Sequence, residues 1–212
     1  MHARIAIILA TFLAAPAWAA DGIEVTVEGI GENGRLAKRY AQCIATADGK
    51  STKGENLRPT VSWTDGPEGT KSYAIVVADA DVPADLSIAN QEDLLIAEDM
   101  PRQTFYHWVQ FNIGQKNREL PGGKMPPGFG RAAANDVSRG TDVYGYGGPC
   151  PPWNDAQIHR YDFTVHALDT AKLIPAEDAK AAEVVAKIES HSIAQGRAVG
   201  TFTLNPTLRK GL

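Results

Sequence analysis

Hydrophobic and polar residues alternate over short stretches along most of the chain. Six such stretches have the length and the β-branched or aromatic content that strands favour. They cover residues 23–27, 60–63, 72–77, 105–113, 161–168 and 197–204. In the fifth stretch, Tyr161, Phe163 and Val165 alternate with polar residues, so one face of that strand is predicted to be buried. The pattern predicts a chain that is rich in strands.

Two other segments show the periodicity of helices. Residues 175–192 carry apolar side chains three and four positions apart with charged residues between them, which predicts an amphipathic helix near the C-terminus. Its predicted apolar stripe consists of Ala179, Ala182, Val185, Ala186 and Ile188. Residues 85–98 predict a shorter helix, in which Ser87 caps the first turn and the apolar residues 94–96 pack against the domain.

Glycine and proline punctuate the segments between these elements. The chain has 20 glycines and 13 prolines, together more than the roughly 12% of average usage. No internal repeat or low-complexity linker divides it. We therefore expect residues 21–212 to form one mostly-β domain, a sandwich or a barrel, with a helix near its C-terminus.

The first 20 residues have the pattern of a targeting segment. Arg4 precedes an uncharged, mostly apolar run over residues 5–15, and Ala17-Trp18-Ala19 matches a small-x-small cleavage site. This predicts a signal peptide over residues 1–20, cleaved near Ala19 or Ala20, and a periplasmic or secreted protein. The alternative is a membrane anchor, but the run is much shorter than the ~20 residues that span a bilayer. No later stretch predicts a transmembrane helix.

Charge and motif content narrow the class of protein further. The formal net charge is −4 and no basic stripe is present, which argues against a nucleic-acid partner. The sequence has no Gly-x-Ser-x-Gly elbow, Walker loop, Gly-x-Gly-x-x-Gly motif, His-Glu-x-x-His motif or Cys-x-x-Cys pair. The common signatures of hydrolases and nucleotide-binding proteins are therefore missing.

Ionisable residues lie on or beside three of the predicted strands. Asp79-Ala80-Asp81 ends one strand, His107 lies within the next, and His159 opens a third. Each alone has an ordinary explanation, as a turn residue or a hydrogen-bonded core histidine. Together, two carboxylates and two imidazoles beside Gly/Pro-rich loops could hold a metal ion or a polar zwitterion.

Six segments follow one another in an order that is typical of a known family. They are GENLRPTVSW, SYAIVVADADVP, FYHWVQFNI, NDVSRGTDVYGYGGPCPP, IHRYDFTVHALD and EVVAKIESHSIAQGRAVGTF. From about residue 25 to 203 the chain thus resembles the phosphatidylethanolamine-binding protein (PEBP) family, in its bacterial Raf-kinase-inhibitor-like branch. The resemblance implies a β-sandwich of a large and a small sheet with peripheral helices.

The resemblance also assigns a ligand pocket residue by residue. The residues assigned are Asp79, Asp81, His107, Pro149, His159 and Tyr161. The two aspartates match the family's Asp-x-Asp pair, the two histidines match its pocket histidines, and residues 149–152 match its Pro-rich wall. In the family these groups line a small pocket for phosphate, acetate or a phosphoethanolamine head group. This implies a binding protein without catalytic residues, cofactor or metal.

The chain departs from the family's pattern at several places. Ala80 stands where Pro is common, and Gln157 stands where the family's Gly-x-His-Arg motif has Gly. If that Gly takes a positive φ, Gln157 would be strained, so we expect a rearranged loop before His159. Residues 44–53 and 84–104 are expected to be insertions. The second connects the strands of Asp79 and His107, and we hypothesise that it is a lid on the pocket.

The two cysteines are predicted to pair. Cys43 and Cys150 occupy places that some exported relatives bridge. An oxidising compartment and an even cysteine count support a Cys43–Cys150 disulfide. The alternative is two buried free thiols.

Three functions remain open at this point. The favoured one is a non-enzymatic periplasmic binding protein for a small anion or a phospholipid head group, whose affinity falls as pH rises through the histidine range near 6.5. The second is an inhibitor of a protease or kinase, with an unknown protein partner. The third is a metal-dependent hydrolase that uses Asp79, Asp81, His107 and His159 around zinc.

Overall fold

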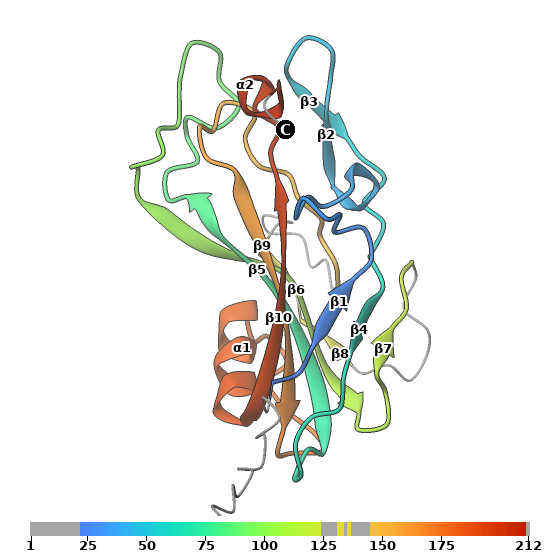
Figure 1. The fold of residues 1–212 in the computed structure, drawn as a ribbon. Helices are drawn as coiled ribbons and strands as arrows, with labels where there is room; N and C mark the ends of the chain where they lie inside the picture. Colours follow the sequence, from blue (N-terminus) through green and yellow to red (C-terminus); the bar gives the residue numbers. More distant parts are fainter. Residues whose placement is uncertain (1–21, 124–130, 134, 137–144, 211–212) are drawn as a thin grey trace, which may run out of the picture.

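The largest sheet has five antiparallel strands in the order β10-β9-β5-β6-β8 (Figure 1). The computed structural model describes residues 22–123, 131–133, 135–136 and 145–210, so the predicted signal peptide lies outside the described residues. The strands are β5 (Ser72–Pro83), β6 (Arg102–Gly114), β8 (Arg131–Ala132), β9 (His159–Leu168) and β10 (Ser192–Phe202). None of the described helices has the length and hydrophobicity to cross a membrane.

A smaller sheet packs on one face of the large one. It contains β1 (Val25–Val27), β4 (Val61–Trp63) and β7 (Glu119–Leu120), all antiparallel. Val27, Trp63 and Leu120 from this sheet share a core with side chains of the large sheet. The core residues from the large sheet are Tyr73, Ile75, Val77, Trp108, Ile113, Tyr161, Phe163 and Val165. The predicted β-sandwich of a large and a small sheet is confirmed.

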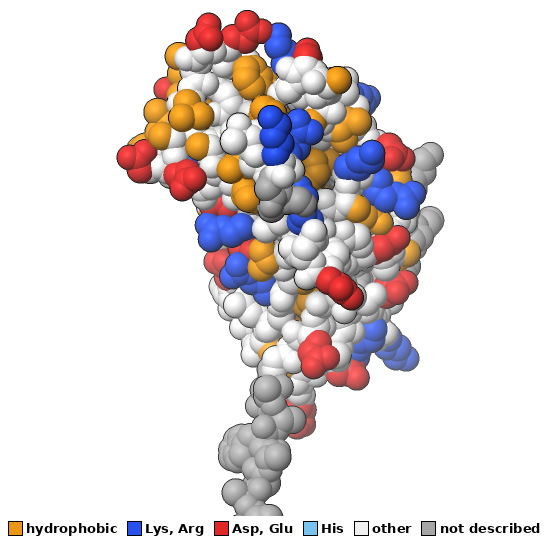
Figure 2. All heavy atoms as spheres, turned by 45° about the horizontal axis from the view of Figure 1, so that its top comes forward, with side chains coloured by type: hydrophobic (Ala, Val, Ile, Leu, Met, Phe, Trp, Pro, Cys, Tyr) orange, Lys and Arg blue, Asp and Glu red, His pale blue; other side chains and the backbone are white. Residues whose placement is uncertain are grey.

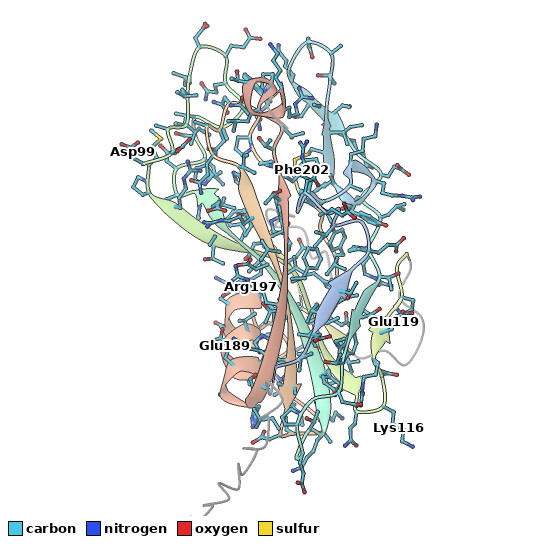
Figure 3. All side chains as sticks on the ribbon, in the orientation of Figure 1. Asp99, Lys116, Glu119, Glu189, Arg197 and Phe202 are labelled. Atoms are coloured by element: carbon cyan, nitrogen blue, oxygen red, sulfur yellow. A yellow bond between two sulfur atoms is a disulfide. The ribbon has the colours of Figure 1, made fainter. Side chains whose placement is uncertain are left out.

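Helix α1 (Ala181–Ser190) covers the other face of the large sheet. In Figure 3, Glu189 marks this helix layer and Glu119 marks the small-sheet layer, on opposite sides of the central strands. The prediction of a helix over 175–192 was too long, because α1 begins at Ala181 and β10 already begins at Ser192. The predicted stripe was also partly wrong, since Ala182 and Ala186 are exposed. The larger side chains of Val184, Val185 and Ile188 set the buried face instead.

The predicted helix over residues 85–98 is wrong. This segment is a series of turns between β5 and β6, in which Asn90 and Asp93 take the left-handed conformation, with φ of 59° and 63°. Two such residues interrupt any continuous right-handed helix. Ile96 is fully buried, whereas Leu95 is 63% exposed. The segment is thus held by single anchor residues and not by a helical apolar face.

Several short elements were not predicted from the sequence. Strands β2 (Cys43–Ala45) and β3 (Ser51–Lys53) form a hairpin from the segment expected as the first insertion. A 3-10 helix η1 (Lys38–Tyr40) precedes the hairpin, and α2 (Pro206–Lys210) follows β10. Residues 84–101 connect β5 to β6 and make up most of the segment expected as the second insertion; they are called the 84–101 connection below. The hairpin, α2 and this connection lie at the same end of the molecule in Figure 1. Lys50 of the hairpin and Glu92 of the connection form an ion pair at 2.5 Å.

Candidate ligand-binding site

A cavity of about 280 Å³ lies at the end of the large sheet, between the 84–101 connection and the loop before β9. Its walls are Gln42, Asp79, Val82, Leu86, Asn90, Phe105, His107, Cys150, Pro151, Pro152, His159 and Tyr161. Four of the six residues assigned from the family resemblance therefore line one cavity. Asp81 and Pro149 are not among the lining residues. Both are buried residues that bind neighbouring segments, Asp81 through Arg160 and Pro149 through Cys43.

Strand register brings the four predicted residues together. Asp79 on β5 lies opposite Tyr161 on β9 and opposite Phe105 on β6. His107 follows two positions after Phe105 and points to the same face of the sheet, because side chains alternate along a strand. The imidazole of His107 then contacts the ring of Tyr161 edge to face, with 5.0 Å between ring centroids. Three neighbouring strands thus build the floor of the cavity.

One side of the cavity is a closed network of charges. His159 Nδ1 lies 2.7 Å from Asp79 Oδ2, and His159 Nε2 lies 3.1 Å from Asp155 Oδ2. Burial alone would lower the pKa of His159, but the hydrogen bonds to Asp155 and Asp79 outweigh it and raise the pKa to about 9. His159 is therefore an imidazolium at neutral pH and donates to both carboxylates.

Arg102 completes this network from β6. Its two terminal nitrogens donate to the two carboxylate oxygens of Asp155, at 2.6 and 3.1 Å. Burial raises the pKa of Asp155, yet the hydrogen bonds from His159 and Arg102 lower it overall. Two carboxylates and two cations balance to zero charge. Sequence reasoning missed Asp155 and Arg102, and their spacing from His159 gave no signal of this arrangement.

Asp81 binds the start of β9 and the loop before it, and it does not line the cavity. Its carboxylate accepts the backbone N–H of Arg160 at 2.9 Å and two guanidinium N–H groups of the same residue at 2.9 and 2.7 Å. Burial opposes ionisation, but these bonds from Arg160 lower the pKa of Asp81 overall. Gln157 Nε2 also donates to Asp81 Oδ1. Gln157 is not among the described residues with positive φ, so it avoids the strain that a positive φ would impose. The rearranged loop stays a prediction.

Three other lining residues each carry a buried polar atom that has no hydrogen-bond partner among the described residues. His107 Nδ1 donates to the carbonyl oxygen of Gly147 at 2.8 Å, because a carbonyl can only accept. Burial lowers the pKa of His107 in spite of Asp79, whose Oδ2 lies 3.9 Å from Nε2. The imidazole is thus neutral, and Nε2 carries a lone pair. Among the described residues, this Nε2, the Tyr161 hydroxyl and the Gln42 Oε1 are buried without a hydrogen-bond partner.

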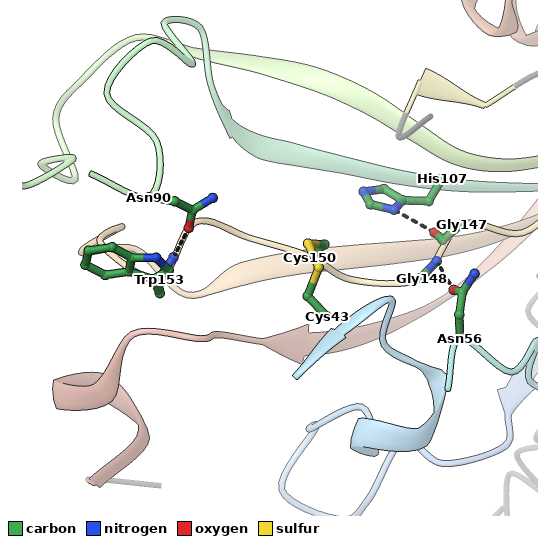
Figure 4. The surroundings of a disulfide bond; sticks show 8 residues. All are labelled: Cys43, Asn56, Asn90, His107, Gly147, Gly148, Cys150 and Trp153. Carbon is green, nitrogen blue, oxygen red and sulfur yellow. Dashed lines mark hydrogen bonds between the residues drawn. A yellow bond between two sulfur atoms is a disulfide. The ribbon is translucent and has the colours of Figure 1, made fainter. Parts of the chain in front are cut away.

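The Cys43–Cys150 disulfide is present and joins β2 to the loop that walls the cavity (Figure 4). Its sulfur atoms link positions 107 residues apart in sequence. Pro149 is buried beside it, and its carbonyl oxygen accepts the backbone N–H of Cys43 at 3.1 Å. Gly148 donates its N–H to Asn56 Oδ1, and a Cβ at this position would lie 2.0 Å from the Tyr40 carbonyl oxygen. Only glycine fits this close backbone approach.

The 84–101 connection contributes Leu86 and Asn90 to the lining of the cavity. Asn154, from the loop before β9, accepts the backbone N–H of Asn90 at 2.8 Å and donates to the carbonyl oxygens of Ile88 and Leu94 at 2.9 and 3.0 Å. Asn90 in turn accepts the backbone N–H of Trp153 (Figure 4). One buried asparagine thus holds the connection in place. The hypothesis that it acts as a lid stays a prediction.

The donor set gives little to a metal ion. Both ring nitrogens of His159 already donate to carboxylates, and Asp81 is saturated by Arg160 and Gln157. Within the described ranges, no three His, Cys, Asp or Glu side chains are grouped as metal ligands would be. The hydrolase alternative therefore gains no support from the geometry of these residues.

Comparison with known proteins agrees with this architecture. The family model described as phosphatidylethanolamine-binding protein matches residues 27–203. A UPF0098 protein of Aquifex aeolicus is 33% identical over 164 residues, which cover 75% of this chain and 78% of that protein. UPF0098 protein YbhB of Escherichia coli is 32% identical over 160 residues, covering 74% and 87%.

A solved structure shows the same fold. The crystal structure of E. coli YbcL, presented as a new member of the mammalian PEBP family, superposes with a TM-score of 0.66 at 26% identity. The match covers 85% of this chain and 98% of YbcL. A sandwich with a polar cavity at one end of its large sheet defines the class of protein, and these matches define the family. The chain belongs to the phosphatidylethanolamine-binding protein family.

Proposed function

We propose that this protein is a non-enzymatic binding protein whose cavity takes a phosphate-like group, either a free phosphate or phosphomonoester or the phosphodiester of a phospholipid head group. One observation carries the proposal. His107 Nε2, Tyr161 Oη and Gln42 Oε1 are buried without protein partners among the described residues, and all three residues line the same cavity. Buried polar atoms without partners are costly. The Tyr161 hydroxyl can donate to a phosphate oxygen, whereas His107 Nε2 and Gln42 Oε1 are acceptors that need a protonated phosphate oxygen or an ammonium N–H of the ligand.

A hydrogen bond between neutral His107 and a phosphodiester or fully ionised phosphomonoester requires the uptake of one proton. Neutral His107 and a fully ionised phosphate oxygen are both acceptors, so a hydrogen bond between them requires a proton on one of them. Asp79 Oδ2, 3.9 Å from His107 Nε2, also favours that proton. The proton can come with a monoester, whose second pKa is about 6. A phosphodiester has none to bring, so His107 itself must become protonated.

The rest of the cavity suits the remainder of such a ligand. Val82, Leu86 and Phe105 provide an apolar wall beside the polar floor. His159 donates to the carboxylates of both Asp79 and Asp155. The Asp79 carboxylate also lines the cavity, where it can attract an ammonium group if the ligand carries one. These features support a small polar head group with a short organic part.

Export is part of the same proposal. The signal-like pattern of residues 1–20 and the Cys43–Cys150 disulfide both suit an oxidising compartment such as the periplasm. Cell fractionation with N-terminal sequencing of the mature protein tests this. A mature N-terminus at residue 20 or 21 in the periplasmic fraction is expected, and an uncleaved cytoplasmic protein would contradict it.

Isothermal titration calorimetry of the full mature chain tests the binding function. Inorganic phosphate, phosphoethanolamine and glycerophosphoethanolamine are titrated at pH 5.5 and pH 8 in buffers of different ionisation enthalpy, which counts the protons taken up. At pH 8 we expect uptake approaching one proton for phosphoethanolamine and glycerophosphoethanolamine, whose phosphate groups carry no P–OH, and little uptake for inorganic phosphate, which still carries one. At pH 5.5 the two monoester-type ligands bind with little uptake. Absence of binding by all three, or binding of phosphoethanolamine and glycerophosphoethanolamine at pH 8 without proton uptake, would overturn the proposal.

A further inference from the structure

A second cavity, of about 420 Å³, shares no lining residue with the first. Three parts of the chain line it: the segment around η1, the hairpin strand β2, and the stretch from the end of β10 into α2. The lining residues are Arg35, Leu36, Lys38, Ile44, Ala45, Phe202, Thr203, Leu204 and Arg209. Figure 3 places Phe202 at the end of β10, directly before this stretch. A cavity of this size falls within the range of small-molecule sites.

The charged lining of this second cavity is entirely cationic. Arg35, Lys38 and Arg209 contribute, and no Asp or Glu is among the lining residues. Lys38 and Arg209 form no ion pair with any residue that the structure describes. Figure 2 shows Lys and Arg side chains gathered at this end of the molecule, beside hydrophobic ones. Lys38 and Arg209 therefore give the cavity a positive potential.

Arg209 adds an unsatisfied donor to this potential. Its Nε is buried and has no hydrogen-bond partner among the described residues. A guanidinium N–H that is removed from water without a partner is costly, and an anion that accepts from it would recover that cost. Guanidinium groups also match the geometry of carboxylate and phosphate oxygens.

The remaining walls are apolar. Leu36 and Leu204 are 3% and 1% exposed, and Ile44 and Phe202 are half-buried at the cavity. A cationic rim next to an apolar floor fits a ligand with an anionic group on a short hydrocarbon body. A fully hydrophilic anion would leave the apolar part of the site unused.

We infer that this second cavity is a binding site for a small amphiphilic anion, a carboxylate or phosphate on an apolar chain, separate from the phosphate-like site at His107. Residue Asn205 ties the two regions together, because its Nδ2 donates to the Asp155 carbonyl oxygen at 2.8 Å and its Oδ1 caps α2. The two cavities have different lining residues, so each can be altered alone.

Calorimetry and ¹⁵N NMR with octanoate, octyl phosphate and octanol test this inference. Saturable binding of octanoate, octyl phosphate or both at the second cavity is expected, with octanoate shifts confined to residues around 35–38, 44–45 and 202–209, and no binding of octanol. Octyl phosphate, as a phosphomonoester, is expected to shift residues of the first cavity as well. A comparison of the two affinities at this cavity shows whether the site prefers a carboxylate or a phosphate. Octanol binding as tightly as the anions, or no saturable binding of either anion, would overturn the inference.

Matched variants locate the site. Arg209→Gln is expected to weaken the anion about tenfold or more, since it removes a charge-assisted hydrogen bond. Lys210→Gln removes the same charge from the next residue of α2, outside the lining, and is expected to change little. Lys38→Gln, at an exposed position, provides a second test if Arg209→Gln fails to fold.

Tyr161→Phe separates this inference from the proposed function, because it alters only the first cavity. It should leave octyl phosphate binding at the second cavity intact. Equal weakening by Lys210→Gln and Arg209→Gln, or loss of octanoate and octyl phosphate binding in Tyr161→Phe, would contradict a site at Arg209.

Discussion

The two histidines of the first cavity are both buried, yet the groups around them differ. His159 donates both ring N–H groups to carboxylates, and its pKa is raised to about 9. His107 donates one N–H to a backbone carbonyl, its pKa is lowered, and its second nitrogen has no partner among the described residues. Two residues that the sequence presents alike therefore differ in role. One holds the fold of the site, and the other is available to a ligand.

The largest effect is expected from removing the satisfied histidine. His159→Leu would leave Asp79 without its buried cation, and Asp155 with Arg102 alone. Breaking a buried ion pair in this way costs about 3–5 kcal/mol of unfolding free energy. Urea denaturation at pH 7 measures this. His191→Leu is the control, because the His191–Asp169 pair is substantially exposed and contributes little. Equal stability of the two variants would contradict the assigned network.

A pH series sharpens the same contrast without mutation. The folded-state pKa of His159 is about 9, above its unfolded value near 6.5, so its contribution is fully present below pH 6.5 and is lost as pH rises toward 9. A shift of this size corresponds to roughly 3 kcal/mol. His107 acts oppositely, since its lowered pKa costs stability only on the acid side. Unfolding free energy that stays constant from pH 6.5 to pH 9 would show that His159 is not held as an imidazolium.

Changes to the lining atoms without hydrogen-bond partners should have the reverse effect: they should alter the affinity for phosphate and preserve the unfolding free energy. Tyr161→Phe removes a buried hydroxyl that has no partner among the described residues, so unfolding free energy should stay within about 1 kcal/mol of the parent or rise. Affinity for inorganic phosphate should fall by about fivefold to tenfold, equivalent to roughly 1 kcal/mol. A variant that loses stability and keeps its phosphate affinity would show that Tyr161 stabilises the fold and does not bind the ligand.

The smallest effect concerns Gln157. Gln157→Ala removes one donor from Asp81, which retains three hydrogen bonds from Arg160. We expect a loss of about 1 kcal/mol or less in unfolding free energy and unchanged phosphate affinity. Thermal denaturation and calorimetry of the same sample measure both. A large drop in affinity would show that Gln157 shapes the cavity directly.

Much of the fold followed from the sequence because strand periodicity is a local property. The alternation from Tyr161 onward identified β9, and the apolar run before Asp79 identified β5. The α1 stripe was misplaced because small alanines on both sides of the helix made two faces look alike. The 85–98 segment misled because three apolar residues suggested a helix, whereas Asn90 and Asp93 take left-handed backbone conformations.

The site was predictable only in part. The family resemblance supplied Asp79, His107, His159 and Tyr161, which all line the cavity. It could not separate the roles of the two histidines, because those depend on Asp155, Arg102 and Gly147, brought in from other segments. The expectation that anion affinity follows a histidine of ordinary pKa is therefore replaced. The relevant imidazole is neutral at pH 7 in the free protein, and proton uptake should accompany binding.

Titration of the imidazole ¹⁵N resonances by NMR, with and without inorganic phosphate, tests this central contrast most directly. The account predicts that His159 stays protonated to about pH 9 and that His107 is the neutral Nδ1–H tautomer at pH 7 in the free protein. Phosphate should leave His159 unchanged and alter the Nε2 resonance of His107, as that nitrogen gains a hydrogen-bonded proton. A free protein with His107 protonated at pH 7, or a His107 Nε2 resonance that saturating phosphate does not change, would contradict it.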